Sequence, residues 1–597
     1  MKEKVVYLCA LRHYETIEEY EARVKLAKEC GFTHYEISNL TDRTHWCIDD
    51  PTDPWLQWNL SHPNFFKRVV PEPLKDFVPA EEAKKEFDMA KARGEILKKY
   101  GMKASYAAWE PSWMPEGFFE KYPRWRGPRI DHPRRTRNKR FAPCMDHPEV
   151  LAMYRDMVNE LVTALPMIDT FFIMTNDSGA GMCWSEHLYN NANGPEACRN
   201  INMGTRISKF MENIVTAATD AGAENVEVHF SSQLTRNEAN ATLPKLSSNM
   251  YMIDWNGTVD AQPYDYGWMG NQVYNFPFNY IPRHFFLSET MLSAYKMPKI
   301  TVNLDATDEH LHTEYMHMIK HALNVTEFGR KQQRELLLKT AAENVGEAAS
   351  YDLVRAWELV QIGLDYTTYP RDGGDILSLG LIMQRWISRP FVPFPLELTH
   401  EEKDYYQKFQ FQANGEDRMA DMMNVQDTYL VDSRVGANYM EKSWTTGLIG
   451  NFSRAIALFE SLIPHALTPE VAALFANTIY AMKTFICFAK SAINCVHFQT
   501  FMYEFAENDG FVTEIYLDMG DRDREFIYNI YRREIDNMYE LIDLLEACPG
   551  VITYAPSHEL EDAFTYSPEL KNQLKKKIDI MNRHWQDFDR IFPRPNR

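Results

Sequence analysis

The sequence has few cysteines for its length, and they follow no recognised motif. There are nine in 597 residues, and no two of them form a CxxC pair. An odd number of scattered thiols is typical of reduced, mostly buried cysteines in a cytoplasmic protein and not of a disulfide framework. We therefore expect a cytoplasmic protein. A periplasmic or secreted one stays open, because a signal peptide could have been removed from the chain.

Several motifs that mark other classes of protein are also missing. The sequence contains no GxGxxG, GxxxxGK[ST], GxSxG or HExxH segment. These absences argue against dinucleotide and nucleotide binding, serine-esterase chemistry and zinc-protease chemistry. We expect no cofactor and no catalytic metal. No run of about 18 apolar residues is present, so no membrane-spanning helix is expected either.

Basic residues are outnumbered by acidic ones, 64 to 84, which gives a net charge of −20. A nucleic-acid-binding protein normally presents a basic face, so nucleic acid is not an expected partner. What the sequence does have is aromatic residues, at 13% of the chain. Such residues build cores, and they also stack on flat sugar faces in binding clefts.

The first 330 residues alternate short apolar runs with helical patterns. Thr16 and Glu19 form a capping box before a helix that Gly31 ends, and further helices are expected near residues 80–100, 148–164 and 203–221. The apolar runs are residues 5–11, 33–40, 102–109, 169–177, 225–233, 249–257 and 298–305, with 322–329 as an eighth. Eight such runs separated mostly by helices predict an α/β fold, a (β/α)8 TIM-like barrel.

Helical patterns dominate after residue 331. In residues 524–548, apolar side chains recur at spacings of three and four and predict one buried face: Ile527, Tyr531, Ile535, Met538, Ile542 and Leu545. The predicted domains are therefore a barrel at residues 1–335 and a large α-helical domain at 336–597. The helical domain is a candidate dimerisation surface or active-site rim, which makes a homodimer one expected assembly.

Catalytic residues of βα barrels lie at the carboxyl ends of the strands. Three aspartates fall there and are our candidate catalytic residues: Asp177, Asp254 and Asp305. Asp177 follows the most apolar strand and precedes Gly179, which lets the chain turn tightly. The alternative for each aspartate is a structural role, capping a helix or a turn.

Other polar and aromatic side chains near the same strand ends are candidates for binding substrate. They are Asn176, Trp109, Glu110, Trp255 and Tyr189. Glu110 and Glu327 also serve as reserve catalytic carboxylates. Carboxylates for proton transfer and flat aromatics for sugar faces are the mixture that glycoside chemistry requires.

An arginine-rich segment at residues 124–140 stands out in this acidic chain. Within it, Arg134 and Arg135 are candidates for binding a carboxylate, sulfate or phosphate, which fits a uronic acid or another anionic sugar. The alternative is a solvated loop, or ion pairs to the acidic surface of the protein, including a contact between subunits.

A histidine-rich segment at residues 305–321 contains His310, His312, His317 and His321. Imidazoles one helical turn apart can bind a metal ion. Four histidines on one helix do not all share a face, however, so we favour a helix that packs on the barrel.

The Asn176-Asp177-Ser178-Gly179 stretch resembles the fourth-strand end of barrel glycosidases related to α-glucuronidases and β-hexosaminidases. In α-glucuronidases an Asn-Ser-Glu-Gly stretch supplies the acid, so the resemblance implies Asp177 as acid and Asp254 and Asp305 as its late-strand partners. In hexosaminidases two adjacent acids stand here, and Asn176 replaces the first. Both families add a helical domain after the barrel.

These observations predict a glycoside hydrolase that releases a sugar, such as a uronic acid, from oligosaccharides or glycoconjugates by carboxylate acid/base catalysis. One alternative is a divalent-metal sugar isomerase or epimerase, because the strand–helix opening with AKECGF and HYEIS is similar to such barrels. Another is a carbohydrate-binding barrel without catalysis.

Overall fold

The computed structural model places two compact units along the chain. One unit comprises residues 1–270, 290–304 and 316–328, and the other comprises 271–289, 305–315 and 329–597. The structure describes residues 4–9, 15–41, 62–115, 117–131, 138–177, 179–186, 188, 193–253, 266–270, 278–304, 308–366, 387–407, 433–507, 517–554 and 566–592.

The first unit contains a parallel sheet whose strands follow the chain order of a TIM-like fold. The order across the sheet is β8-β7-β6-β3-β2-β1-β10-β9, so the first strand along the chain pairs with the last. The strands are β1 (Val5–Cys9), β2 (His34–Glu36), β3 (Lys103–Trp109), β6 (Ile168–Thr175), β7 (Glu227–Ser232), β8 (Met250–Ile253), β9 (Tyr266–Gly270) and β10 (Lys299–Asn303).

The sheet curls until side chains from distant strands meet inside it. Lys299 of β10 donates to the hydroxyl of Tyr251 on β8 at 2.7 Å, and Tyr7 of β1 donates to Glu227 of β7 at 3.1 Å. Neither pair of strands is adjacent in the sheet. Within the described residues no ladder joins β8 to β9, so the fold is an α/β, TIM-like one whose closure remains a prediction.

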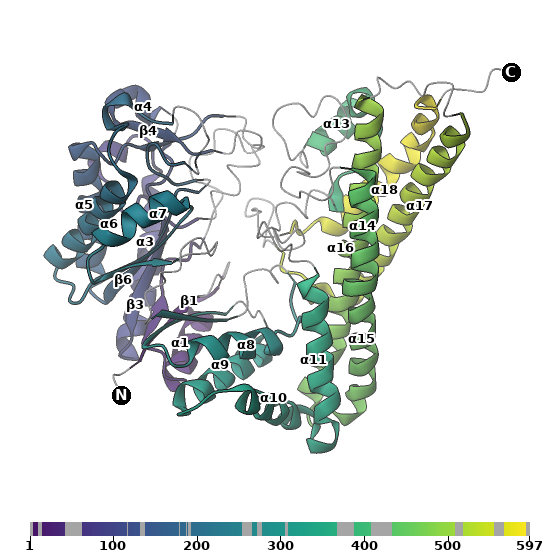
Figure 1. The fold of residues 1–597 in the computed structure, drawn as a ribbon, viewed down its shortest axis with the longest axis horizontal. Helices are drawn as coiled ribbons and strands as arrows, with labels where there is room; N and C mark the ends of the chain where they lie inside the picture. Colours follow the sequence, from purple (N-terminus) through teal and green to yellow (C-terminus); the bar gives the residue numbers. More distant parts are fainter. Residues whose placement is uncertain are drawn as a thin grey trace. The chain divides into compact units, whose positions relative to one another are not determined.

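Helices cover the outer side of this sheet. Helices α5 and α6 pack side by side, α6 also contacts β7, and α3 contacts β3 (Figure 1). The predicted capping box is confirmed at Thr16, and Gly31 has the left-handed φ of 90° that ends the first helix. The helices are α1 (Ile17–Glu29), α3 (Ala80–Lys99), α4 (Phe118–Lys121), α5 (Pro148–Ala164), α6 (Met203–Asp220), α7 (Arg236–Thr242), α8 (His284–Ala294) and α9 (Glu309–Asn324).

One predicted strand is wrong. Residues 322–329 are not a strand: helix α9 continues to Asn324, and a short connection follows in which Phe328 is buried. The apolar run there is the last turn of an amphipathic helix. Strand β9 of the parallel sheet was not predicted. It has glycine at two of its five positions, and its residues show too little apolar alternation to be identified as a strand from the sequence.

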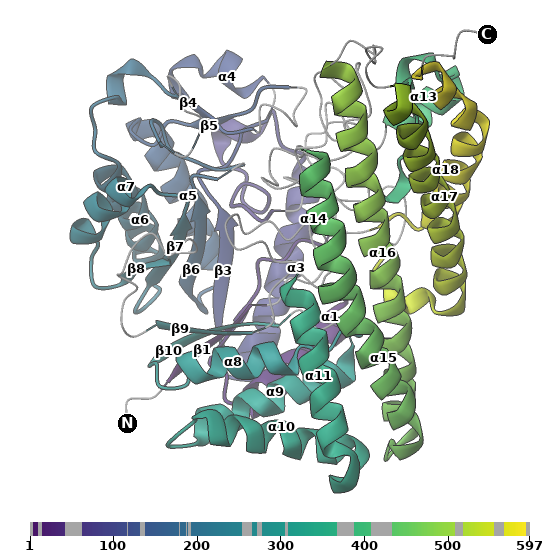
Figure 2. The same cartoon turned by 45° about the vertical axis from the view of Figure 1, so that its right-hand side comes forward.

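The second unit is helical, as predicted for most of the C-terminal sequence. Helix α16 packs against α14, α15 and α17, and α17 packs against α18 (Figure 2). The helices are α10 (Arg330–Val345), α11 (Ser350–Asp365), α13 (His400–Gln407), α14 (Arg434–Trp444), α15 (Gly450–Leu462), α16 (Pro469–Glu507), α17 (Leu517–Ala547) and α18 (Leu570–His584).

Helix α16 is long and apolar enough to cross a membrane by length and composition alone, contrary to the expectation that no such segment exists. Its apolar window is 67% buried inside the protein. Phe485, Phe488 and Phe498 on this helix are buried against other helices or connecting segments of the same unit. The apolar surface of α16 is thus used in helix packing.

Candidate functional site

The strand register decides which side chains reach the inside of the curled sheet. Successive residues of a strand point to opposite faces, and paired residues share a face. Tyr7 points inward, because it contacts His229 and Phe172. At the carboxyl ends of the strands, the inner face therefore receives Cys9, Glu36, Trp109, Met174, Ser231 and Asn303.

Trp109 is the aromatic side chain at this inner edge. It is half-buried, and His62 stacks on it with ring centroids 3.8 Å apart and planes 5° apart. Its backbone N–H donates to the carbonyl of Pro63 at 2.9 Å. The stacked histidine and the backbone contact fix the indole plane at the inner edge of the sheet.

Asn176 follows β6 and acts on the backbone. Its φ is +56°, a left-handed conformation that asparagine tolerates better than most residues. The side chain is buried, and its Oδ1 accepts from the N–H of Met182 at 3.0 Å. Asn176 thus redirects the chain at the strand end and closes the loop that follows.

Asp177 lies at the start of the turn that Asn176 sets up. Its N–H donates to the carbonyl of Ala180 and its own carbonyl accepts from the N–H of Ala180, both at 3.1 Å. Gly179, at φ +106°, donates to Ile130, and Gly181 donates to Pro111. The half-buried Asp177 is therefore presented by a turn that is clamped on both sides.

Glu110 lies one residue beyond Trp109 and faces the helix layer. It is fully buried, and its carboxylate accepts from the N–H groups of Phe65 and Ser112, both at 2.8 Å, and from the hydroxyl of Tyr154 on α5 at 2.7 Å. Burial raises the pKa of Glu110 to about 7. These contacts join three segments beneath the strand ends, so the placement favours a supporting role over contact with substrate.

The reserve carboxylate Glu327 lies away from these strand ends. It is exposed in the connection after α9, the helix that returns from the end of β10. The expectation that it ends a strand is therefore wrong, because no strand forms there.

Six predicted site residues lie outside the described residues: Asp254, Trp255, Asp305, Arg134, Arg135 and Tyr189. Two of them follow strands closely. Asp254 comes directly after β8, which ends at Ile253, and Asp305 comes two residues after β10, which ends at Asn303. The carboxyl ends of parallel strands lie at one edge of a sheet, which is why we expect both aspartates at this site. Their assignment to the site stays a prediction.

The described part of the arginine-rich segment is held by its own contacts. Arg129 binds Asp131 through Nε and Nη2 at 2.6 to 2.9 Å, and Asp131 also accepts from the N–H of Arg140 at 2.7 Å. The guanidinium of Arg126 lies 5.0 Å from the centre of the Phe141 ring. These contacts lie within the segment itself, and the roles of Arg134 and Arg135 stay predictions.

Glu36 is a carboxylate that the sequence analysis did not select. It ends β2 on the inner face, is buried, and accepts from the hydroxyl of Ser38 at 2.6 Å. Asn303, at the end of β10, has a buried Oδ1 with no hydrogen-bond partner among the described residues. The sequence could have pointed to Glu36 through its position at the end of the HYE strand. That strand is too short and does not alternate between apolar and polar residues, so the sequence did not show which face of the sheet Glu36 lies on.

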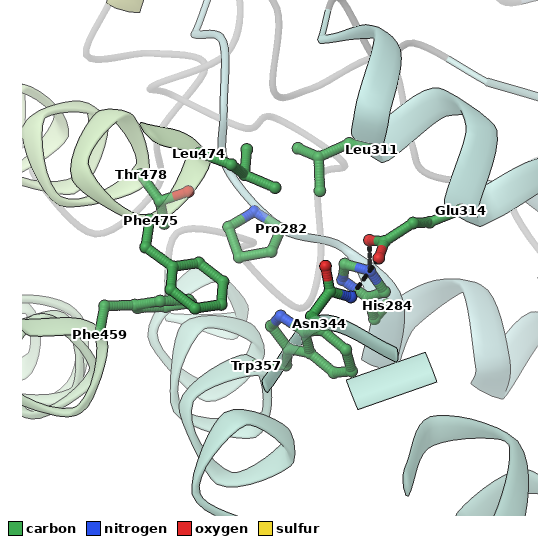
Figure 3. A pocket seen from close by; sticks show the side chains of 10 residues that line it. All are labelled: Pro282, His284, Leu311, Glu314, Asn344, Trp357, Phe459, Leu474, Phe475 and Thr478. Atoms are coloured by element: carbon green, nitrogen blue, oxygen red, sulfur yellow. Dashed lines mark hydrogen bonds and ion pairs between the residues drawn. The ribbon is translucent and has the colours of Figure 1, made fainter. Parts of the chain in front are cut away.

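The histidine-rich helix contributes to a small pocket within the second unit, lined by Leu311, Glu314, Pro282 and Trp357 among others (Figure 3). Glu314 accepts from His284 at 2.8 Å and pairs with His310 at 3.3 Å. The hydrogen bond to Glu314 raises the pKa of His310 to about 9. Glu314 is thus occupied by two imidazoles, and His317 points to solvent.

The curled parallel sheet with covering helices and a polar strand-end edge defines the class: an α/β protein of the TIM-like type with an appended helical unit. The sequence matches no family model and no curated protein. Comparison with solved structures therefore rests on the fold.

The fold is similar to that of glycoside hydrolases. A GH138 enzyme that targets pectin rhamnogalacturonan II aligns over 100% of this chain and 69% of its own, with a TM-score of 0.53 and 10% identity. A family 89 glycoside hydrolase from Clostridium perfringens aligns over 99% and 64%, with a TM-score of 0.45 and 10% identity. The predicted resemblance to glycoside hydrolases is confirmed at the level of the fold.

Proposed function

We propose that this protein is a glycoside hydrolase whose active site lies at the carboxyl edge of the curled sheet. The observation that carries the proposal is the clamped turn that presents Asp177 after β6, on the strand adjacent to the one that ends in Trp109. A carboxylate on a hydrogen-bonded turn, next to a strand that ends in a half-buried tryptophan, is an arrangement that sugar cleavage uses. The fold shared with the GH138 enzyme adds support.

In the proposed mechanism, Asp177 protonates the glycosidic oxygen as the bond to the sugar breaks. Asp254 or Asp305 acts either as a base on water or as the nucleophile. The separation of the two carboxyl groups decides the outcome, about 5–5.5 Å for retention and roughly 6.5–9.5 Å for inversion. Trp109 stacks on the sugar ring, and Arg134 and Arg135 pair with an anionic substituent.

The substrate class that we propose is an oligosaccharide carrying a uronic acid or another anionic sugar. The arginine-rich loop supplies the cations for it, within a chain of net charge −20. Because the similar GH138 enzyme targets a pectin, pectin oligosaccharides are the first substrates to test.

The test compares wild-type protein with Asp177→Asn on a panel of uronides, N-acetylhexosaminides and neutral glycosides, each with and without EDTA. We expect hydrolysis that survives EDTA and falls about 100- to 10,000-fold in Asp177→Asn, the range typical of a lost general acid. Asp220→Asn is the matched control, because Asp220 is exposed at the last residue of α6. Equal activity in both variants would contradict the role of Asp177.

The same panel separates the alternatives. Turnover of free sugars only with added divalent metal would identify an isomerase, for which the buried Glu36 at the inner edge is the carboxylate ligand to test. Ligand binding by Asp177→Asn with no turnover by either protein would indicate a binding protein. The cytoplasmic location and the homodimer also remain proposals, which fractionation and light scattering test.

A further inference from the structure

Three cysteines that lie far apart in the sequence come together in the first unit. The sulfur atoms of Cys144, Cys183 and Cys198 all lie within 4.8 Å of one another, and all three side chains are buried. Cys144 follows β5 (Phe141–Pro143), Cys183 follows the turn of Asp177, and Cys198 ends a short 3-10 helix (Glu196–Cys198) that precedes α6. The half-buried Trp184 packs against the cluster.

Charged groups also surround these thiols. The Oδ2 atom of Asp146 lies 4.0 Å from the sulfur of Cys144. Arg206 of α6 is 2% exposed, lies 3.3 Å from Asp146 through Nε, and donates to the carbonyl of Cys183. The ion pair between Asp146 and Arg206 compensates the burial of both charges. It also places a carboxylate oxygen and a cation at the edge of the three thiols, which are the groups that could complete and balance a metal site.

We propose that Cys144, Cys183 and Cys198 bind one zinc ion, and that the carboxylate of Asp146, which lies beside Cys144 and outside the three-sulfur cluster, turns in as the fourth ligand. Tetrahedral zinc with Zn–S bonds of about 2.3 Å places its sulfur ligands about 3.8 Å apart, which the cluster permits. Three thiolates and a carboxylate leave a net charge of about −2 on the zinc centre, and Arg206 offsets part of it. On binding, each thiol loses its proton to solvent while the sulfur lone pair forms the bond to zinc.

The proposed ion has a structural role. A closed site of three cysteines and one carboxylate leaves no position for substrate, which distinguishes it from a catalytic zinc. It would join the loop after β5, the loop after β6 and the start of α6. Met182, the neighbour of Cys183, donates to the side chain of Asn176, so the site lies next to the turn that presents Asp177.

The test is the metal content of the full-length protein, expressed with zinc in the medium and passed through a desalting column with EDTA. We expect about one zinc per chain in the wild type and a loss of most of it in Cys183→Ser. The matched control is Cys548→Ser, because Cys548 is half-buried in the second unit and contacts Asn477. This variant is expected to retain the metal.

A second measurement uses only wild-type protein, in case Cys183→Ser does not fold. Titration with an organomercurial should release zinc in step with the modification of three thiols, and Co2+ loaded in its place should show thiolate-to-metal charge-transfer absorption. Zinc at background level in the wild type, equal zinc in both variants, or a disulfide between two of the three cysteines would each overturn the proposal. None of these readouts depends on glycosidase activity.

Discussion

The protonation of Glu110 is coupled to the folding of the protein. Its pKa is raised by burial to about 7, above the ordinary value of 4.5. Between these values the unfolded chain loses the proton while the folded protein keeps it, so stability falls as the pH rises through this window. Above pH 7 the full penalty is about 3 kcal/mol. Below pH 4.5 this group has no effect.

The variant Glu110→Gln tests this coupling. A neutral amide cannot ionise, so the loss of stability between pH 4.5 and 7 should be smaller than in the wild type. Urea unfolding at several pH values measures the difference, and the exposed Glu120 supplies the control Glu120→Gln. The explanation is wrong if Glu110→Gln shows the same pH slope as the wild type.

Asn176 allows a second test, which separates conformation from hydrogen bonding. Asn176→Ala loses the bond to Met182 and strains the left-handed backbone, and we expect a cost of about 2–3 kcal/mol. Asn176→Gly relieves the strain and loses only the hydrogen bond, so its cost should be smaller, about 1 kcal/mol. Urea midpoints for the two variants give the comparison. Equal costs would show that the φ of Asn176 carries no strain.

At the scale of elements, helices α16, α17 and α18 share a buried polar contact. Glu534 of α17 accepts from Ser491 at 2.5 Å, from Asn494 at 2.9 Å and from Lys577 of α18 at 2.5 Å. Both charged side chains are fully buried. The stripe predicted for α17 is confirmed at Ile527, Met538 and Leu545, whereas Ile535 is only half-buried.

Removal of one partner should therefore be costly. Glu534→Ala removes the carboxylate that pairs with the buried Lys577 ammonium, and we expect a loss of about 3–5 kcal/mol. The double variant Glu534→Met with Lys577→Met removes both charges and should lose much less. Glu540→Ala breaks the exposed pair with Lys490 and should cost less than about 1 kcal/mol. Thermal unfolding of the three variants measures the stability that each one loses. A double variant that loses as much stability as Glu534→Ala would contradict this explanation.

At the scale of the molecule, the two units interleave along the chain. Helices α8 and α9 each contribute residues to both. In the second unit, His284 of α8 stacks on Trp357 at 3.8 Å, and Asn344 contacts Glu314 of α9. A chain cut at the predicted boundary between residues 335 and 336 would separate α8 and α9 from Trp357 and Asn344.

A chain that ends at residue 335 tests the consequence. It would expose Leu311 and His284, which are buried in the full chain, so we expect it to aggregate or unfold at a lower temperature. Gel filtration and calorimetry of the fragment and the full chain give the readout. A monomeric fragment as stable as the full chain would show that the first 335 residues fold independently.

The sequence alone determined the elements that have strong local signals. The capping box at Thr16, the apolar strand before Asn176 and the amphipathic helix α17 arise from neighbouring residues, and these were predicted correctly. The polar turn at Asp177 was found for the same reason: a buried strand that ends in polar and glycine residues is visible in a single segment.

Only the tertiary structure decided which faces and which distant residues meet. The register of β2, β3 and β6 turns Glu36 inward and Glu110 outward, and a shift of one residue would exchange these faces. The cluster of Cys144, Cys183 and Cys198 has no spacing motif, because three separate loops bring it together. Contacts of this kind depend on the path of the whole chain, so local sequence patterns carry no record of them.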